Sequence, residues 1–360
     1  VGVTYSGQPE YGTFKATAYI LENAFMVSLA ALFYGDPDRI ERFLKALAAS
    51  GWLLGLIAGA WLLEAGFEMM GRLHPESYNP LQFARSVAMS IIGCFAVFLI
   101  RYRRGEFRPT ALAFVPVGLG LMLLSGGKGP LLSLVASLIV LIFLAQKTRS
   151  LAVRALRMGA ILLVLAAGAV AAFPFLPVAV QERLMPTLSQ TAYAGSIGAR
   201  IDRMAHGWRM FREAPILGHG TGSFVFGGQI GDYPHNILLE LLSENGLIGL
   251  FLWTGLLCVG LLAVHRGIRS QTRLSSVAQP TAVATAAVTA LLVLSIVAAM
   301  FSFNIVGNSS IWFFLGMLYM RHPGCGAVRT VHRGEQDLTA CAPKLTGPVA
   351  PEAIAGVHVL

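Results

Sequence analysis

The sequence predicts an all-α polytopic membrane protein, on the basis of its composition, its apolar runs and the alternation of charge between those runs. Of its 360 residues, 55% are hydrophobic and 12% are charged, which is too few charges for the surface of a soluble domain of this size. The apolar runs approach the roughly 20 residues that a helix needs to cross a bilayer. This composition excludes a soluble enzyme, a disordered chain and a coiled coil, and the net charge of +9 is assigned to loops rather than to nucleic-acid binding.

We expect about nine transmembrane helices, one in each apolar run. The first run is weak because Glu22 and Asn23 interrupt it, and the fourth and fifth runs form a hairpin through the turn 125–130. The last two runs are also compatible with a re-entrant pair. The runs cover residues 16–33, 46–66, 83–100, 110–125, 130–145, 158–180, 246–264, 281–303 and 305–320.

Basic residues orient these helices. Four connections carry three or four basic residues each, whereas the short connections between them carry Arg72 and Lys128. Because basic residues concentrate in short cytoplasmic loops, Arg72 and Lys128 are placed on the exterior side. The segment 181–245 then also faces the exterior, which is the periplasm in a Gram-negative cell.

The predicted organisation has four parts. Residues 1–180 form about six spans, 181–245 form one large exterior loop, 246–320 return to the membrane, and 321–360 form a poorly ordered cytoplasmic tail. The chain begins at Val1 without a signal-peptide pattern, so we interpret it as an N-terminally truncated fragment. Its four cysteines form no C-x-x-C pair, so we expect neither a metal site nor a disulfide framework.

The exterior segment contains an amphipathic helix at residues 196–213. Its apolar stripe lies within an arc of about 80° and faces either the membrane or the helix bundle. Arg200 lies at the edge of the stripe and can reach a site, whereas Arg209 lies on the far side and meets water; either arginine could instead be an interface anchor. The stripe comprises Ile197, Ile201, Met204, Trp208 and Phe211.

Alternating glycines follow this helix. Gly218, Gly220 and Gly222 permit positive φ, so residues 215–224 form either a tight turn or a nest of amides that binds an anion. The stretch lacks the lysine of a Walker loop and does not follow a strand, which excludes nucleotide-binding loops.

A third motif, Asp232-Tyr233-Pro234-His235-Asn236, precedes a helix. Asn236 is a good N-cap, and His235 is either structural or a general base just outside the membrane. Glu240 and Glu244 share one face of this helix. Four roles are open for these two glutamates: they cap the helix, pair with arginines, bind substrate or lie on a helix face exposed to water.

Taken in order, these motifs resemble the O-antigen ligase and Wzy-type polysaccharide polymerase superfamily. His235-Asn236, nine residues and then Gly246-x-x-Gly249 match its signature, and the stretch from Arg200 to Phe224 is similar to its R-x-x-x-(W)…P-L-x-G-x-G-x-G-x-F pattern. The turn 125–130 resembles the family's S-x-S-R-G turn. Two positions depart from the family patterns: Met204 stands where Trp is usual, and Lys128 stands where Arg is usual. A further stretch matches the R…NP…R pattern that the family often has, through Arg72, Asn79-Pro80 and Arg85.

The resemblance implies a metal-independent glycosyltransferase without cofactors in the bacterial cell inner membrane, with its active site facing the periplasm and about twelve spans in the full chain. It would transfer a glycan from an undecaprenyl-pyrophosphate-linked donor to an acceptor hydroxyl in lipopolysaccharide or exopolysaccharide biosynthesis. In this reading His235 is the base and Arg200 stabilises the pyrophosphate. The implied substrate-binding residues are Lys128, Arg203, Arg72, Arg85, Gly220, Gly222, Asn236 and Glu240.

Three questions stay open at this point. The motifs do not distinguish a ligase from a polymerase, because both share them. The acceptor is a lipid A core, a growing glycan or a protein hydroxyl. The rival class is a membrane transporter of a glycan or lipid-linked intermediate, which would carry ionisable residues in mid-span and inverted repeats. Glu22 and Glu64 are candidates for such residues, but the sequence shows no convincing inverted repeat.

Overall fold

The computed structural model describes residues 2–33, 37–65, 79–145, 151–175, 198–272 and 279–319, with Val178 and Gln181. These residues lie in one compact unit, Val1–His322. In this part of the chain five helices are long and apolar enough to cross a membrane: 38–64, 80–103, 128–145, 237–262 and 282–299. The prediction of a helical, multi-pass membrane protein is confirmed, whereas the described residues provide five such helices rather than about nine.

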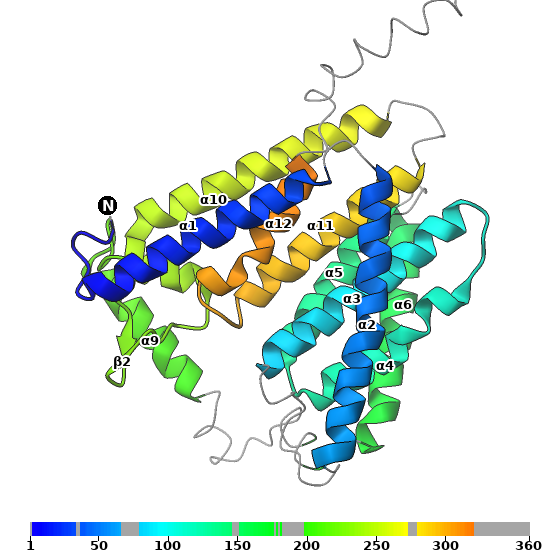
Figure 1. Ribbon diagram of the computed structural model, residues 1–360, viewed down its shortest axis with the longest axis horizontal. Coiled ribbons are helices and arrows are strands. Elements are labelled where there is room, and N and C mark those ends of the chain that lie inside the picture. Colours follow the sequence, from blue (N-terminus) through cyan, green and yellow to red (C-terminus); the bar gives the residue numbers. More distant parts are fainter. Residues whose placement is uncertain are drawn as a thin grey trace, which may run out of the picture. The chain divides into compact units, whose positions relative to one another are not determined.

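The order of elements is nearly all helical (Figure 1). A short antiparallel hairpin, β1 with β2, pairs Val225 with Ile230. The elements are α1 (Pro9–Ala31), α2 (Pro37–Ala65), α3 (Pro80–Arg103), η1 (Pro109–Leu112), α4 (Phe114–Leu124), α5 (Lys128–Ala145), α6 (Leu151–Ala172), η2 (Phe173–Phe175), α9 (Gly198–Glu213), β1 (Val225–Phe226), β2 (Gln229–Ile230), α10 (Ile237–Thr272), α11 (Gln279–Ala299), η5 (Val306–Asn308) and α12 (Ser310–Tyr319).

Two predicted spans are shorter than their apolar runs. The run 110–125 divides into η1 and the eleven-residue α4, and the run 305–320 gives the ten-residue α12. A ten-residue helix is about 15 Å long, half the hydrocarbon thickness of a bilayer. These two runs therefore give helices shorter than a typical span, while the total number of spans stays a prediction.

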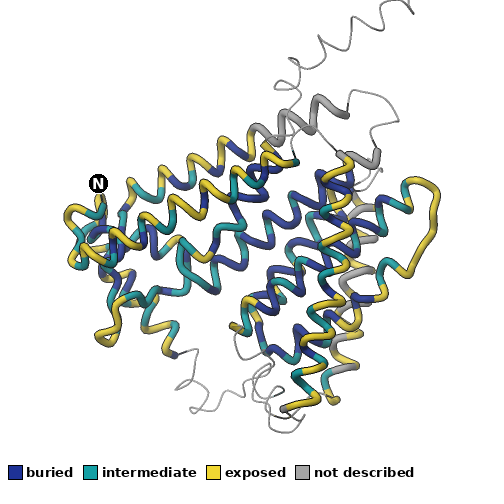
Figure 2. The backbone as a smooth tube through the Cα atoms, viewed as in Figure 1, coloured by how far each residue is buried: buried dark blue, intermediate teal, exposed yellow. Residues whose placement is uncertain are grey.

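Helices α3, α5 and α11 pack against one another and form the centre of the bundle. Their facing surfaces are buried, and many exposed residues lie on α1, α2 and much of α10 (Figure 2). Helix α1 packs against α12, and α9 packs against α10. The exposed side chains of α10 include Phe251 and Leu252, which are apolar, as expected for a surface that faces lipid.

The motif glycine Gly246 breaks α10 near the candidate site. Its φ is 63° and its ψ is −161°, which is outside the helical region. A Cβ at Gly246 would collide with the carbonyl oxygen of Ile216, so the close approach of the 215–218 segment requires glycine here. The amide freed beyond the break, that of Leu247, donates to the carbonyl of Pro215 at 2.9 Å.

Candidate functional site

His235 lies directly before α10 in an unusual backbone conformation. Its φ is 56°, and Phe303 has a φ of 65°; no other non-glycine residue that the structure describes has positive φ. The His235 ring lies edge-on to Tyr233, with ring centroids 4.4 Å apart. Strained backbone of this kind, held in place by its surroundings, is common at functional sites.

The α11–α12 loop, residues 300–309, connects the predicted site residues. The Asn236 side-chain amide donates to the Met300 carbonyl at 3.4 Å. From α3, the buried Arg85 donates from Nη2 to the Ser302 hydroxyl at 3.2 Å and lies over the Phe303 ring, 5.0 Å from its centroid. Asn236 and Arg85 therefore both bind the same loop, although they come from distant parts of the chain. No motif in the sequence indicates that this loop belongs to the site.

Arg200 and Arg203 approach His235 from α9. Arg203 Nε pairs with Asp232 Oδ2 at 2.6 Å, and its guanidinium lies over the Phe226 ring at 5.3 Å. Burial lowers the pKa of Arg200, the nearby Tyr233 raises it, and the charge of Arg203 lowers it again. Two guanidinium groups therefore lie within electrostatic reach of one imidazole.

The His235 imidazole is neutral at neutral pH because its surroundings lower its pKa. Burial, followed by the positive charges of Arg200 and Arg203, lowers the pKa of His235 to about 4, while Asp232 opposes the shift. Its buried Nδ1 has no hydrogen-bond partner among the described residues. A neutral imidazole with an unpartnered nitrogen can accept a hydrogen bond or a proton from a bound hydroxyl.

Lys128 begins α5 and its side chain is exposed. The next residue, Gly129, faces Phe301 of the α11–α12 loop; a Cβ at Gly129 would lie 2.8 Å from the Phe301 Cβ. This contact brings the 125–130 turn to the same loop that holds Asn236 and Arg85. Arg72 lies outside the described residues.

Gly220 and Gly222 have the positive φ that the sequence predicted, 96° and 78°. Their amides donate to the backbone carbonyl of Glu244 at 2.8 Å and to its Oε2 at 2.9 Å, respectively. The amides from Gly218 to Ser223 all donate within the protein. Of the two predicted alternatives, the structure therefore favours the tight turn over the anion nest. The glycines let the start of the chain pack closely, since a Cβ at Gly222 would lie 2.8 Å from the Cα of Gly12.

Among the described residues, Glu240 and Glu244 are buried from water and pair with a lysine instead of an arginine. Both bind Lys15 of α1: Nζ lies 2.5 Å from Glu240 Oε1 and 2.8 Å from Glu244 Oε1. Glu240 Oε2 also accepts the Ile305 amide at 3.0 Å. The triad Lys15–Glu240–Glu244 therefore joins α1, the glycine-containing segment 215–224 and the α11–α12 loop. Glu240, which the sequence predicted to bind substrate, is already paired with Lys15.

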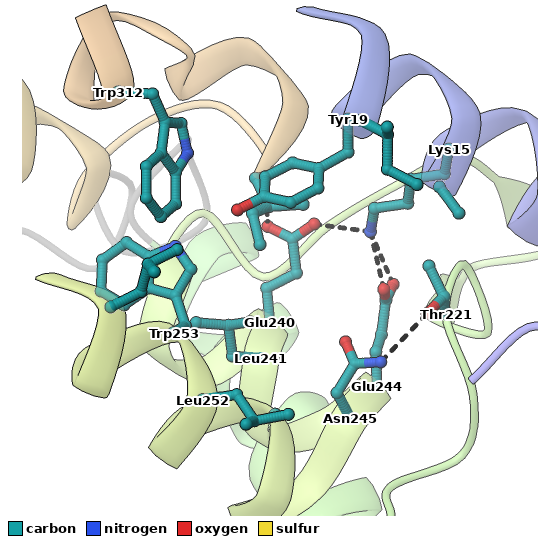
Figure 3. Close-up of a pocket in the computed structure, with 15 residues that line it drawn as sticks. Lys15, Tyr19, Thr221, Glu240, Leu241, Glu244, Asn245, Leu252, Trp253 and Trp312 are labelled. Carbon is teal, nitrogen blue, oxygen red and sulfur yellow. Dashed lines mark hydrogen bonds and ion pairs between the residues drawn. The ribbon is translucent and has the colours of Figure 1, made fainter. Parts of the chain in front are cut away.

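A cavity of about 340 Å³ lies beside this triad (Figure 3). Figure 3 shows the three charged side chains meeting at one side of the cavity, with Tyr19 next to Glu240 and with Trp253 and Trp312 at the other side. Most of its remaining lining is apolar. Within the described ranges, no group of three or more His, Cys, Asp or Glu side chains could hold a metal ion.

Removing Lys15 should strongly destabilise the protein. Lys15→Met leaves two buried carboxylates without their cation, which typically costs about 3–5 kcal/mol. We expect a lower melting temperature in detergent, and recovery in the triple variant Lys15→Met/Glu240→Gln/Glu244→Gln, where no charge is left unpaired. A melting temperature unchanged by Lys15→Met would show that the triad does not hold these segments together.

The apolar stripe of α9 does not face the bundle. Ile201, Met204 and Trp208 are 42%, 37% and 48% exposed, whereas Gly207 and Met210 are buried. Ile197 lies outside the described residues. The helix packs through a neighbouring face, so the interpretation of the stripe as a bundle contact is wrong. Arg209 is exposed, as expected.

Two comparisons with known proteins bear on this site. Residues 113–254 match the family described as O-antigen ligase, a range that includes Lys128, Arg200 and His235. A Pseudomonas aeruginosa protein named O-antigen ligase is 27% identical over 186 residues, which cover 50% of this chain and 40% of that protein. Both matches agree with the motif resemblance: this chain is similar to O-antigen ligases over part of its length, and it spans less than half the length of the curated relative.

Proposed function

We propose that this protein is a glycosyltransferase of bacterial surface polysaccharide biosynthesis that transfers a glycan from an undecaprenyl-pyrophosphate-linked donor to an acceptor hydroxyl. The observation that carries the proposal is the neutral His235 beside Arg200 and Arg203. This arrangement combines a proton acceptor with fixed positive charge, the two features that the reaction requires. The similarity to O-antigen ligases supports the same reaction class.

In the proposed reaction, the acceptor oxygen attacks the anomeric carbon of the donor sugar. A new C–O bond forms, the bond to the pyrophosphate oxygen breaks, and undecaprenyl pyrophosphate leaves. His235 accepts the proton of the attacking hydroxyl. Arg200 stabilises the negative charge that develops on the leaving group, because a guanidinium can bind phosphate oxygens in a bidentate manner.

The other site residues receive supporting roles. Arg203, held by Asp232, maintains the positive field around His235. Arg85 and Lys128 flank the α11–α12 loop and are proposed to bind donor phosphates; Arg72 is proposed for the same purpose from the sequence alone. Asn236 caps α10, since its Oδ1 accepts the Leu239 amide at 3.1 Å. Glu240, bound to Lys15 and Ile305, positions this loop rather than substrate.

The acid limb of the pH profile of kcat/KM should show the lowered pKa of His235. Because the base is the neutral imidazole, kcat/KM should be flat from about pH 6 to 8 and fall as the pH drops toward about 4, not near the ordinary value of about 6.5. Arg203→Gln removes one of the charges that lower this pKa, so it should move the acid limb to higher pH. An acid limb at the same pH in both proteins would contradict the electrostatic role of Arg203.

The proposed orientation has its own test. We expect a membrane-impermeant thiol reagent to label Gln229→Cys from outside intact cells, because the exterior segment faces the periplasm. Glu106→Cys, which is equally exposed but lies in a basic connection, should be labelled only after the membrane is opened. Labelling of both positions in intact cells would overturn the topology and the periplasmic site.

Three acceptor classes fit this chemistry: a lipid A core, a growing glycan and a protein hydroxyl. Transfer to a lipid A core would make the protein a ligase, and transfer to a growing glycan would make it a polymerase. The transport alternative finds less support, because the cationic residues gather around a potential base rather than along a path through the bundle. Incubation of the purified protein with lipid-linked donor and each acceptor separates these enzymatic outcomes.

A further inference from the structure

Helix α9 has three distinct faces. At 100° per residue, their centres are separated by about 90° to 140°. One face packs on the protein: Gly207 is buried against Leu239 of α10, and the His206 ring lies 5.3 Å from that of Phe224. The second face is polar and exposed, and the third is the exposed apolar stripe. The polar face carries Asp202, Arg209 and Glu213, and the stripe carries Ile201, Met204, Trp208 and the partly buried Phe211.

A helix that lies between the protein and water needs only two faces, an apolar face toward the protein and a polar face toward water. A third, apolar face requires a third environment, since exposed Ile, Met and Trp side chains on one arc are unfavourable in water. Interfacial membrane helices combine large apolar side chains, including Trp, with arginines on the polar face. Helix α9 has this composition, with Arg212 exposed beside the stripe and Arg209 exposed on the polar face.

The position of α9 agrees with a membrane boundary. Gly207 contacts Leu239, in the first turn of a helix that can span the bilayer. Figure 1 shows α9 running across the end of α10 rather than along it, as expected for a helix parallel to the membrane plane. The next apolar residues, Ile216 and Leu217, are 62% and 50% exposed.

These residues extend the apolar surface toward lipid. Pro215 and Ile216 bond to the amides of Leu247 and Ile248, and both of those α10 side chains are also exposed. Phe251, 68% exposed, follows on α10. Exposed apolar residues therefore run from α9 through the 215–217 segment to the lipid-facing side of α10.

We propose that the stripe of α9 inserts into the lipid leaflet on the His235 side, so that the helix lies in the headgroup region with its third face on the protein. Arg209 and Arg212 then lie near anionic lipid phosphates. Arg200, at the border between the protein face and the stripe, lies at the depth of the headgroups. A phosphate group attached to a membrane lipid meets Arg200 there without leaving its own layer.

Tryptophan fluorescence in vesicles tests this insertion without any substrate. The purified protein is placed in phosphatidylcholine–phosphatidylglycerol vesicles, with or without bromine on the acyl chains near the headgroup. The contribution of Trp208 is the difference between wild type and Trp208→Phe. We expect this contribution to be blue-shifted and quenched by bromine. The matched control, Trp208→Phe/Arg209→Trp, moves the indole to the polar face, where it should be red-shifted and unquenched.

A Trp208 signal as insensitive to bromine as the control would overturn the proposal, and would show that water, other residues or another protein covers the stripe. A second pair of variants tests the consequence for lipid phosphates. Met204→Glu should weaken binding of undecaprenyl pyrophosphate in these vesicles by on the order of tenfold, because a charge is unfavourable in lipid. Ala205→Glu, one residue away on the polar face, should not. Equal binding by both variants would refute the link to Arg200, while the fluorescence result would stand independently of enzymatic activity.

Discussion

Replacing His235 with Asn should lower glycan transfer by about 10²- to 10⁴-fold while the protein still inserts and folds, because this is the usual contribution of a general base. Asn is the appropriate substitute for structural reasons. It tolerates the left-handed backbone that His235 adopts, with its φ of 56°, and it can also cap a helix. His235→Ala would add backbone strain to the loss of the imidazole.

The measurement is the initial rate of transfer by purified protein, normalised to folded protein. His219→Asn is the matched control, since His219 lies in the same segment between α9 and α10 and binds the Met210 carbonyl rather than the Arg200–His235 cluster. We expect it to change the rate only a few-fold. Lipid-linked donor should accumulate in cells with His235→Asn, because donor synthesis precedes this step. An active His235→Asn protein would leave His235 a structural residue.

Arg200→Ala should lower transfer by about 10²- to 10³-fold, the range seen when a group that stabilises developing negative charge is removed. Arg209→Ala should have little effect, since Arg209 lies on the exposed polar face of the same helix. Both substitutions remove one arginine from α9, so a difference between them reflects position rather than charge. Rates are compared at equal protein levels, and equal losses at the two positions would place the site elsewhere.

The long apolar runs predicted the central helices well. The runs 83–100, 130–145 and 281–303 correspond to α3, α5 and α11 within a few residues. The run of α4 was predicted to be short, whereas the lengths of α4 and α12 could not be predicted, because their ends depend on contacts and not on hydropathy. The left-handed conformation of Phe303 has no signal in the sequence, so the α11–α12 loop could not be recognised as part of the site.

Motif spacing predicted the cluster of Arg200 and His235 but not the partner of the glutamates. Lys15 lies 229 positions from Glu244, so no local pattern relates them. A signal was nevertheless present, since two glutamates on one face at the start of a span need a cation, and α1 contains a lysine. The glycines illustrate the opposite case: their positive φ was predictable, whereas the use of their amides depended on tertiary structure.

The most direct test of the account is the simultaneous measurement of both reaction products in reconstituted vesicles. Lipid-linked donor extracted from cells that lack this protein is incubated with the purified protein and an acceptor glycolipid. We predict that undecaprenyl pyrophosphate is released in equal amount to the glycan gained by the acceptor, and that His235→Asn abolishes both. Movement of lipid-linked glycan across the membrane, with neither free undecaprenyl pyrophosphate nor glycosylated acceptor, would contradict the account and favour transport.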